Sequence, residues 1–127
     1  HDRFEDLDED TRIERLLTTN YALYENDYAD TFVKETLRSF RCIDEIQQEN
    51  GESGCHRYII SNCQSALNVA EVLALAKLTG AGPRVQETPV NIDIVPLFET
   101  IDDLAHCPAI MEKLYTNPHY AAHLRHR

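Results

Sequence analysis

The carboxylate of Glu99 is the candidate for a reactive or ligand-binding group that this sequence indicates most clearly. It follows a β-branched run, Ile92 to Val95, that ends in Pro96-Leu97-Phe98, and a helical pattern begins immediately after it. In α/β proteins, the carboxyl end of a strand is where reactive groups are presented to a ligand. A glutamate there could bind a divalent cation or act as an acid or base. The alternative is that Glu99 merely caps the following helix, where the dipole favours a carboxylate.

Other polar residues have simpler structural interpretations. His119 and His123 are four positions apart and could share a helix face, but Tyr120 stands where a metalloprotease would place glutamate. We therefore expect exposed histidines rather than a metal pair. Asp102 and Asp103 fit the start of a helix. Four residues after the first predicted strand could touch a polar ligand, but a strand-to-helix turn is favoured: Ser61, Asn62, Cys63 and Ser65.

Several kinds of site are not indicated. The sequence has neither a glycine-rich phosphate loop nor a Gly-x-Ser-x-Gly elbow. The four cysteines, at positions 42, 55, 63 and 107, form no Cys-x-x-Cys pair, which disfavours a zinc or redox motif. No basic residue adjoins Cys63 to lower its pKa. We expect reduced thiols in a cytosolic protein.

Charge excludes further classes of function. The chain has 12 Lys and Arg against 22 Asp and Glu, a net charge of −10, so nucleic-acid and membrane-surface roles are disfavoured. Six acidic residues crowd the first ten positions and predict a solvated leader or a helix N-terminus. No apolar run approaches the roughly 20 residues that would cross a bilayer. The sequence lacks an initial methionine and ends in a helix-like pattern, so we expect a piece of a longer protein.

The helices and strands that must position Glu99 are predicted from hydrophobic periodicity and from residues that start or end helices and turns. Helices are predicted at Thr11–Leu17, Ala29–Gln48 and Ala66–Leu78, and strands at Arg57–Ser61 and Ile92–Leu97. Gly80, Gly82, Pro83 and Pro89 predict a loop between residues 79 and 90. Thr100 and Asp103 predict a capping box for a helix that begins at Ile101. Pro108 would interrupt that helix or start a second one, Pro108–Tyr115, and Asn117-Pro118 predicts the start of a last helix. The helix at 66–78 is apolar on most sides, so we expect it to lack part of its cover in this chain.

The order strand, helix, strand, helix predicts an α/β fold, mostly helical, with two parallel strands joined by a right-handed crossover. Two strands rarely make a stable sheet alone. A segment of a (β/α) TIM-type barrel with long helices explains this pattern best. We divide the chain into a helical segment, residues 1–53, and a β-α-β-α barrel segment, residues 54–127.

Two segments together resemble phosphoenolpyruvate carboxylase. The first is Tyr58-Ile59-Ile60-Ser61 followed by Ser65-Ala66-Leu67-Asn68-Val69-Ala70-Glu71-Val72-Leu73, and the second is Val95-Pro96-Leu97-Phe98-Glu99-Thr100-Ile101-Asp102-Asp103-Leu104. A tail such as Pro118-His119-Tyr120-Ala121-Ala122-His123-Leu124 is also similar to that family. The resemblance covers about residues 54–124.

The resemblance implies a fragment of a cytoplasmic, homotetrameric carbon–carbon lyase that converts phosphoenolpyruvate and bicarbonate to oxaloacetate and phosphate. It implies that Glu99 is a ligand of Mg²⁺ or Mn²⁺. In this family bicarbonate attacks the phosphoryl group, which gives carboxyphosphate and the enolate of pyruvate. Carboxyphosphate supplies the carbon dioxide that the enolate captures, and phosphate is released. The family's second metal-binding carboxylate, its catalytic histidine and its phosphate-binding arginines lie outside this sequence, so we expect the isolated chain to be inactive.

Two alternatives remain at this point. The chain could be a small helical interaction or regulatory module that retains a barrel-derived sequence. It could also belong to another metal-dependent barrel enzyme that uses phosphoenolpyruvate or pyruvate.

Overall fold

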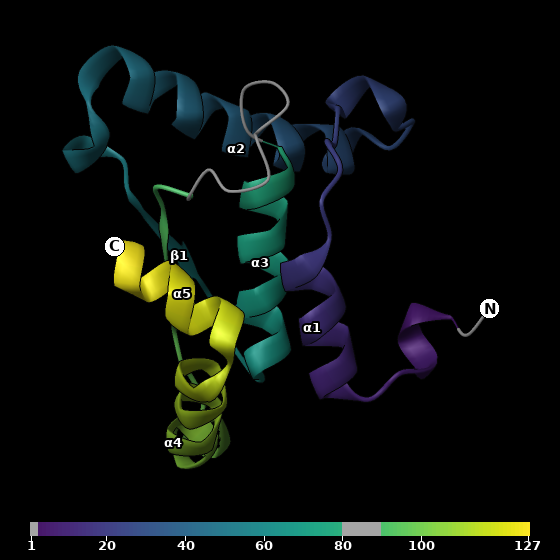
Figure 1. Cartoon of the computed structure of the whole chain (residues 1–127), viewed down its shortest axis with the longest axis vertical. Helices are drawn as coiled ribbons and strands as arrows, with labels where there is room; N and C mark the ends of the chain where they lie inside the picture. Colours follow the sequence, from purple (N-terminus) through teal and green to yellow (C-terminus); the bar gives the residue numbers. More distant parts are fainter. Residues whose placement is uncertain (1–2, 80–89) are drawn as a thin grey trace. The chain divides into compact units, whose positions relative to one another are not determined.

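The computed structural model describes residues 3–79 and 90–127, which form five α-helices and two strands within those ranges (Figure 1). The elements in chain order are α1 (Glu9–Thr18), α2 (Thr31–Asn50), β1 (Arg57–Ile60), α3 (Ala66–Leu78), β2 (Asp93–Pro96), α4 (Ile101–Thr116) and α5 (Pro118–His126). Short 3-10 helices occupy Phe4–Asp6, Glu25–Asp27 and Glu52–Gly54. Every predicted helix and strand is therefore present, with ends that differ by a few residues. The predicted loop between 79 and 90 falls almost entirely outside the described residues.

The chain separates into two compact units. Unit 1 contains His1–Thr19, Ile59–Ala74 and Ile94–Arg127, and unit 2 contains Asn20–Tyr58 and Leu75–Asp93. The strands and α3 each contribute residues to both units. Glu99 and the elements around it belong to unit 1. The division after residue 53 that we drew from the sequence stays a prediction.

β1 and β2 pair as the sequence predicts, in a parallel sheet of two strands among the described residues. The backbone carbonyl of His56 accepts from the amide of Asp93 at 2.7 Å, and that of Ile60 from the amide of Leu97 at 2.9 Å. Both bonds join residues separated by 37 positions (56 to 93 and 60 to 97), so the two strands rise together in one constant register. Their carboxyl ends consequently meet at the same edge. The barrel itself is not shown by two strands and stays a prediction.

α3 is better covered than its sequence led us to expect. Eight of its residues are buried, namely Ala66, Leu67, Val69, Ala70, Leu73, Ala74, Ala76 and Leu78, and none of the others is exposed. The expectation of missing cover is therefore wrong. Four of the eight are alanines, whose small side chains let neighbouring backbone approach closely, so a modest chain suffices to enclose the helix.

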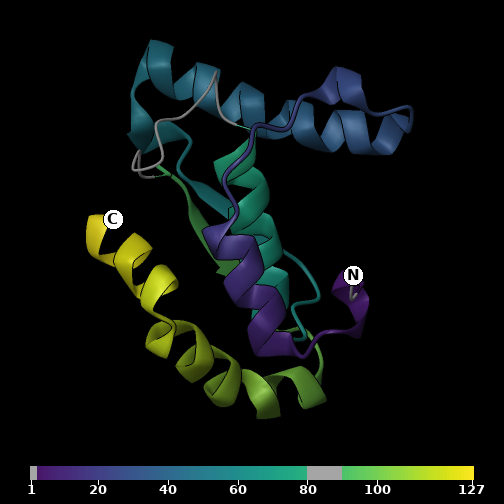
Figure 2. The same ribbon diagram turned by 45° about the vertical axis from the view of Figure 1, so that its right-hand side comes forward.

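α4 corrects a second expectation. Pro108 was predicted to break the helix, yet α4 runs through it from Ile101 to Thr116 (Figure 2). Proline removes one helical hydrogen bond, the one to the carbonyl of Leu104. Because Pro108 and Leu104 are both exposed, water can replace that donor. The chain then turns at Asn117, whose side chain caps α5 as predicted by accepting from the amides of His119 and Tyr120.

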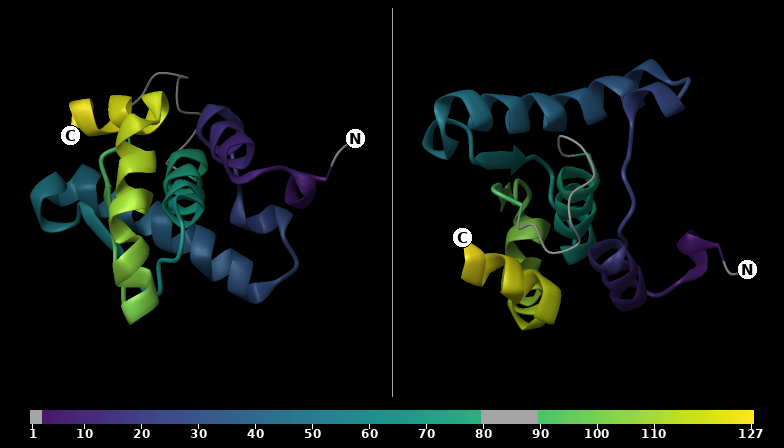
Figure 3. Two further views of the ribbon diagram at one scale, coloured as in Figure 1. Left: turned by 90° about the horizontal axis from the view of Figure 1, so that it is seen from below. Right: turned by 45° about the horizontal axis from the view of Figure 1, so that its top comes forward.

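In unit 2, α2 is an amphipathic helix that leads into β1 (Figure 3, right). The side chain of Asp30 caps its start, and Gly51, with φ at 80°, ends it. Leu37 and Phe40 are its buried residues, and the Phe40 ring stacks on Tyr58 with centroids 4.9 Å apart. These contacts fix the direction in which the chain enters β1.

Candidate functional site

The strand-end region consists of residues 61–65, which follow β1, and residues 97–100, which follow β2. Two backbone bonds join its halves: the amide of Leu97 donates to Ile60 at 2.9 Å, and the carbonyl of Leu97 accepts from the amide of Cys63 at 3.0 Å. Glu99 is exposed there, and its Oε1 accepts from the backbone amide of Asn62 at 3.3 Å. The predicted site residue therefore lies where the two strand ends meet.

Glu99 does not cap the helix that follows it. Thr100 is the N-cap of α4, and its Oγ1 accepts from the amide of Asp103 at 3.0 Å. The Asp103 carboxylate in turn accepts from the amide of Thr100 at 3.1 Å, which completes the predicted capping box. Capping is thus performed by other residues, and the Glu99 carboxylate is turned to the other strand end.

The residues after β1 build the turn that the sequence predicts. The amides of Gln64 and Ser65 donate to Asn68 Oδ1 at 3.0 and 3.2 Å, and Ser65 Oγ accepts from the amide of Asn68 at 3.4 Å. This is a capping box at the start of α3 with asparagine in place of glutamate. Cys63 is fully buried, and burial raises the pKa of its thiol, which therefore stays protonated and is a poor nucleophile.

A divalent cation fits Glu99 by donor type, because Mg²⁺ and Mn²⁺ prefer carboxylate oxygen. The number of donors is smaller than a complete site needs. Within residues 3–79 and 90–127, no group of three or more His, Cys, Asp or Glu could hold a metal ion. Glu99 can therefore supply one ligand, and the other protein ligands would have to come from outside the described part of the chain.

The remaining candidates from the sequence have structural partners. His119 Nε2 lies 2.9 Å from Glu14 Oε1, an interaction that joins α5 to α1. The side chain of His123 lies beside Tyr120, with ring centroids 6.1 Å apart. Asp102 faces His106, 3.6 Å from its Nδ1. Neither His119 nor His123 belongs to a group of three or more His, Cys, Asp or Glu that could hold a metal ion within the described residues.

A charged contact between α1 and α4 is the feature that sequence reasoning missed. Lys113 Nζ lies 3.0 Å from Glu9 Oε2 and 2.9 Å from Asp10 Oδ1, and these carboxylates raise its pKa by hydrogen bonding. Glu9 also accepts from the amide of Leu67 at 3.4 Å. The acidic start of the chain is therefore partly paired rather than wholly solvated. Its partner lies about a hundred residues later, and no local pattern announces it.

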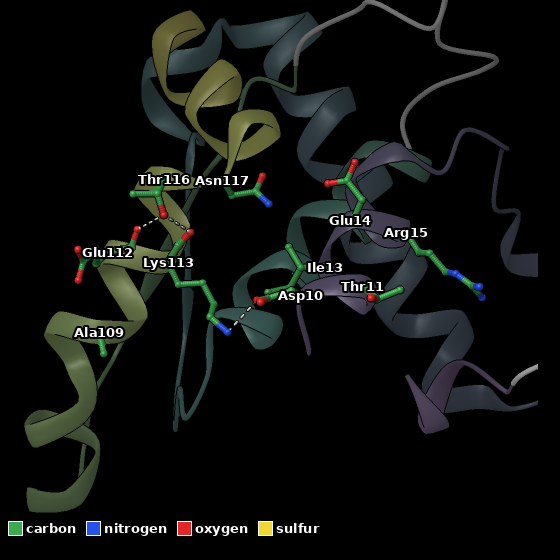
Figure 4. A pocket seen from close by; sticks show the side chains of 10 residues that line it. All are labelled: Asp10, Thr11, Ile13, Glu14, Arg15, Ala109, Glu112, Lys113, Thr116 and Asn117. Atoms are coloured by element: carbon green, nitrogen blue, oxygen red, sulfur yellow. Dashed lines mark hydrogen bonds and ion pairs between the residues drawn. The ribbon is translucent and has the colours of Figure 1, made fainter. Parts of the chain in front are cut away.

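A cavity of about 770 Å³ adjoins this contact (Figure 4). Its lining comes from α1, α4 and the turn before α5: Asp10, Thr11, Ile13, Glu14, Arg15, Ala109, Glu112, Lys113, Thr116 and Asn117. In Figure 4 Lys113 reaches across it to Asp10. The lining carries charges of both signs, of which Asp10 and Lys113 pair with each other within the wall. Glu99 is not among the lining residues.

The similarity to known proteins extends over the whole chain. The family model described as "Phosphoenolpyruvate carboxylase" matches residues 1–127, which extends the similarity beyond the 54–124 range expected from motifs. Proteins of that name from Prochlorococcus marinus (strain MIT 9312) and Gloeobacter violaceus are 38% and 35% identical over 89% and 95% of this chain. A Synechocystis protein of the same name is 41% identical over 72% of it.

The matched region is a small part of those relatives. This chain spans 12% of the Prochlorococcus protein, 13% of the Gloeobacter protein and 9% of the Synechocystis protein. No solved structure is significantly similar to it. Among the residues described here, no helix has the length and apolar character needed to span a membrane.

Proposed function

Because this chain belongs to the phosphoenolpyruvate carboxylase family, we propose that it forms one part of such an enzyme, to which Glu99 supplies a ligand for a divalent metal ion. The enzyme would be a (β/α) barrel lyase that joins phosphoenolpyruvate to bicarbonate and releases oxaloacetate and phosphate. We further propose that it is a cytoplasmic homotetramer that uses Mg²⁺ or Mn²⁺. The chain by itself would be inactive, because its described residues supply one candidate metal ligand, Glu99, and no complete metal site.

The exposure of the Glu99 carboxylate and its small number of partners support this proposal best. The side chain is exposed at the carboxyl end of β2, and its only partner within the described residues is the Asn62 amide on Oε1. The Oε2 atom has no protein partner there. A carboxylate that neither pairs with a cation nor caps a helix is free to bind a ligand at the edge where α/β proteins place theirs.

The chemistry divides between the metal and the chain. A bound dication would stabilise the negative charge that develops on the enolate oxygen when the phosphoryl group leaves. Glu99 would provide a carboxylate oxygen as a metal ligand at the strand edge. Leu97 and Thr100 hold it in place on either side, through the backbone bonds to β1 and the capping box of α4.

The test is a metal titration of the full-length protein that contains this segment. Oxaloacetate formation from phosphoenolpyruvate and bicarbonate would be followed across a range of Mn²⁺ concentrations for the unmodified protein, Glu99→Gln and Glu14→Gln. Glu14 is the matched control, since its carboxylate is already held by His119. We expect Glu99→Gln to raise the Mn²⁺ concentration for half-maximal activity by more than about 100-fold, beyond the range typical of residues that only support a ligand.

Each other outcome has a definite meaning. An active protein in which Glu99→Gln behaves as Glu14→Gln would remove Glu99 from the metal site. A full-length protein without activity on phosphoenolpyruvate would overturn the proposed reaction, and activity on pyruvate would assign the other barrel chemistry. Oxaloacetate formation by the isolated 127-residue chain would show that no further part is needed.

A further inference from the structure

Asn62 is the only residue other than glycine with a positive φ in the described ranges, at 52°. This left-handed conformation is uncommon for side chains with a Cβ, and asparagine is among the few residues that adopt it readily. Backbone held in such a region clusters at functional sites, because surrounding contacts must enforce it. Asn62 lies one residue before the buried Cys63 and directly opposite Glu99.

The surrounding contacts show what enforces the turn. Leu97 uses both of its backbone groups on the other strand end: its amide donates to Ile60 and its carbonyl accepts from Cys63. Residues 60 and 63 are therefore both tied to one residue, and the backbone between them must reverse tightly. The left-handed residue in that reversal is Asn62, and its side-chain Oδ1 accepts a local bond from Gln64 at 3.4 Å.

The register shows what the turn achieves. Asn62 and Glu99 are separated by 37 positions, the same offset that pairs β1 with β2. The two backbone bonds at that offset run from amides on the β2 side to carbonyls on the β1 side. Past the strand ends, amides after β1 donate instead: that of Cys63 to the carbonyl of Leu97, and that of Asn62 to the carboxylate of Glu99. The Glu99 side chain thus accepts a backbone amide just beyond the ends of both strands.

We propose that Asn62 is a positioning residue for Glu99, a role that rests on the proposed function above. Its left-handed backbone directs an amide at Oε1, which restrains the carboxylate and leaves Oε2 for the divalent cation. The role belongs to the backbone conformation rather than to the side-chain amide. Partners that orient a metal ligand in this way contribute substantially to metal affinity, with losses of about 10- to 100-fold when they are removed.

Alanine and glycine at position 62 form the decisive pair of variants. Both remove the side-chain amide, but only glycine adopts positive φ without steric cost. The experiment measures Mn²⁺ binding to the full-length protein without substrate, from the loss of the free Mn²⁺ signal in electron paramagnetic resonance. We expect Asn62→Ala to raise the Mn²⁺ dissociation constant by about 10-fold or more, and Asn62→Gly to restore most of the affinity.

The outcomes separate this inference from the proposed function. If Glu99→Gln weakens Mn²⁺ binding but Asn62→Ala binds as the unmodified protein does, the positioning role is overturned and the metal site stands. If alanine and glycine weaken binding equally, the backbone conformation is not the cause, which also overturns it. If Glu99→Gln itself leaves Mn²⁺ binding unchanged, the proposed function fails and the role of Asn62 fails with it.

A kinetic readout excludes a general loss of folding. We expect Asn62→Ala to recover the turnover number of the unmodified protein at saturating Mn²⁺, because only the metal's affinity has changed. Its melting temperature should match that of Asn62→Gly within a few degrees. A turnover number that stays low at saturating metal would contradict the inference.

Discussion

Unit 1 holds carboxylates in two regions that treat them in opposite ways. In the helix-contact region, formed by α1, α4 and α5, each of three carboxylates has a basic partner: Glu9 and Asp10 lie 3.0 and 2.9 Å from Lys113, and Glu14 lies 2.9 Å from His119. In the strand-end region, Glu99 has a backbone amide at 3.3 Å and no basic partner among the described residues.

The two regions also differ in packing: side chains are more buried in the helix-contact region than in the strand-end region. Ile13 and Leu114, in the helix-contact region, are 2% and 1% exposed, whereas Leu97 and Ile101, beside Glu99, are 42% and 89% exposed. A neutralised carboxylate on a packed interface contributes to the fold, and an unpaired carboxylate on an open edge contributes little to it. The difference teaches that unit 1 has a packed region, which holds paired carboxylates, and an open region, which holds the carboxylate that we propose as a metal ligand.

Removing a core side chain from the helix-contact region should have the largest effect. We expect Leu114→Ala to lower the free energy of unfolding by about 2–5 kcal/mol, because it leaves a cavity in a fully buried position. Equilibrium unfolding in urea measures this change. Leu104→Ala is the matched control on the same helix, and it should cost little because Leu104 is 57% exposed. Equal losses for the two variants would break the distinction between packed and open faces of α4.

Removing a helix cap should have an intermediate effect. Asn117 Oδ1 accepts from the amides of His119 and Tyr120 at 3.0 and 3.1 Å. We expect Asn117→Ala to cost about 1 kcal/mol, since two donors at the start of α5 lose their acceptor. The shift of the urea midpoint at constant slope measures it. Asn117→Asp should retain nearly all the stability, because aspartate caps as well, and a large loss in that variant would contradict the assignment.

Removing the shared cation should have the smallest effect and a characteristic pH dependence. Lys113 has its pKa raised in the folded state, so its pairs stabilise the fold below about 10.5, and this contribution is lost as the pH rises through the higher folded value. We expect Lys113→Met to cost less than about 1 kcal/mol at neutral pH, because the pair is partly exposed and screened by solvent.

The loss of stability between neutral and alkaline pH should be smaller in Lys113→Met than in the unmodified protein. The control is Lys34→Met, because Lys34 takes part in no ion pair within the described residues. Thermal unfolding measured across alkaline pH would check both variants. If the stability of Lys113→Met and that of Lys34→Met changed identically with alkaline pH, the contact between α1 and α4 would not depend on charge.

Much of the local structure followed from the sequence, because its causes are local. The capping box of Thr100 and Asp103 and the Asn117-Pro118 start of α5 are short-range patterns, and each is present. The position of Glu99 at a strand end followed from the order of elements. The effect of Pro108 was predicted wrongly. The free-energy cost of a proline within a helix depends on whether the carbonyl that loses its donor is exposed to water, and the local sequence does not determine that exposure.

The non-local features could not be predicted in the same way. Lys113 reaches Glu9 across about a hundred residues, and only the folded arrangement of α1 and α4 brings them together. Asn62 was expected to form a turn, and it does, but the sequence does not show that its amide meets Glu99. That contact depends on the register of two strands that are joined through a helix. Nothing in the types of Asn62 and Glu99 specifies the offset.

The proline within α4 has a dynamic consequence. Backbone hydrogen bonds make a helix resist local opening. Pro108 has no N–H to donate to the carbonyl of Leu104, so one of these bonds is missing between the first turns of α4 and the later ones. The first turns carry the buried Asp103, and the later turns carry Ile110 and Leu114. The missing hydrogen bond favours local opening of the turns next to Glu99 before the turns that carry Ile110 and Leu114, so we expect faster amide exchange in the first turns of α4.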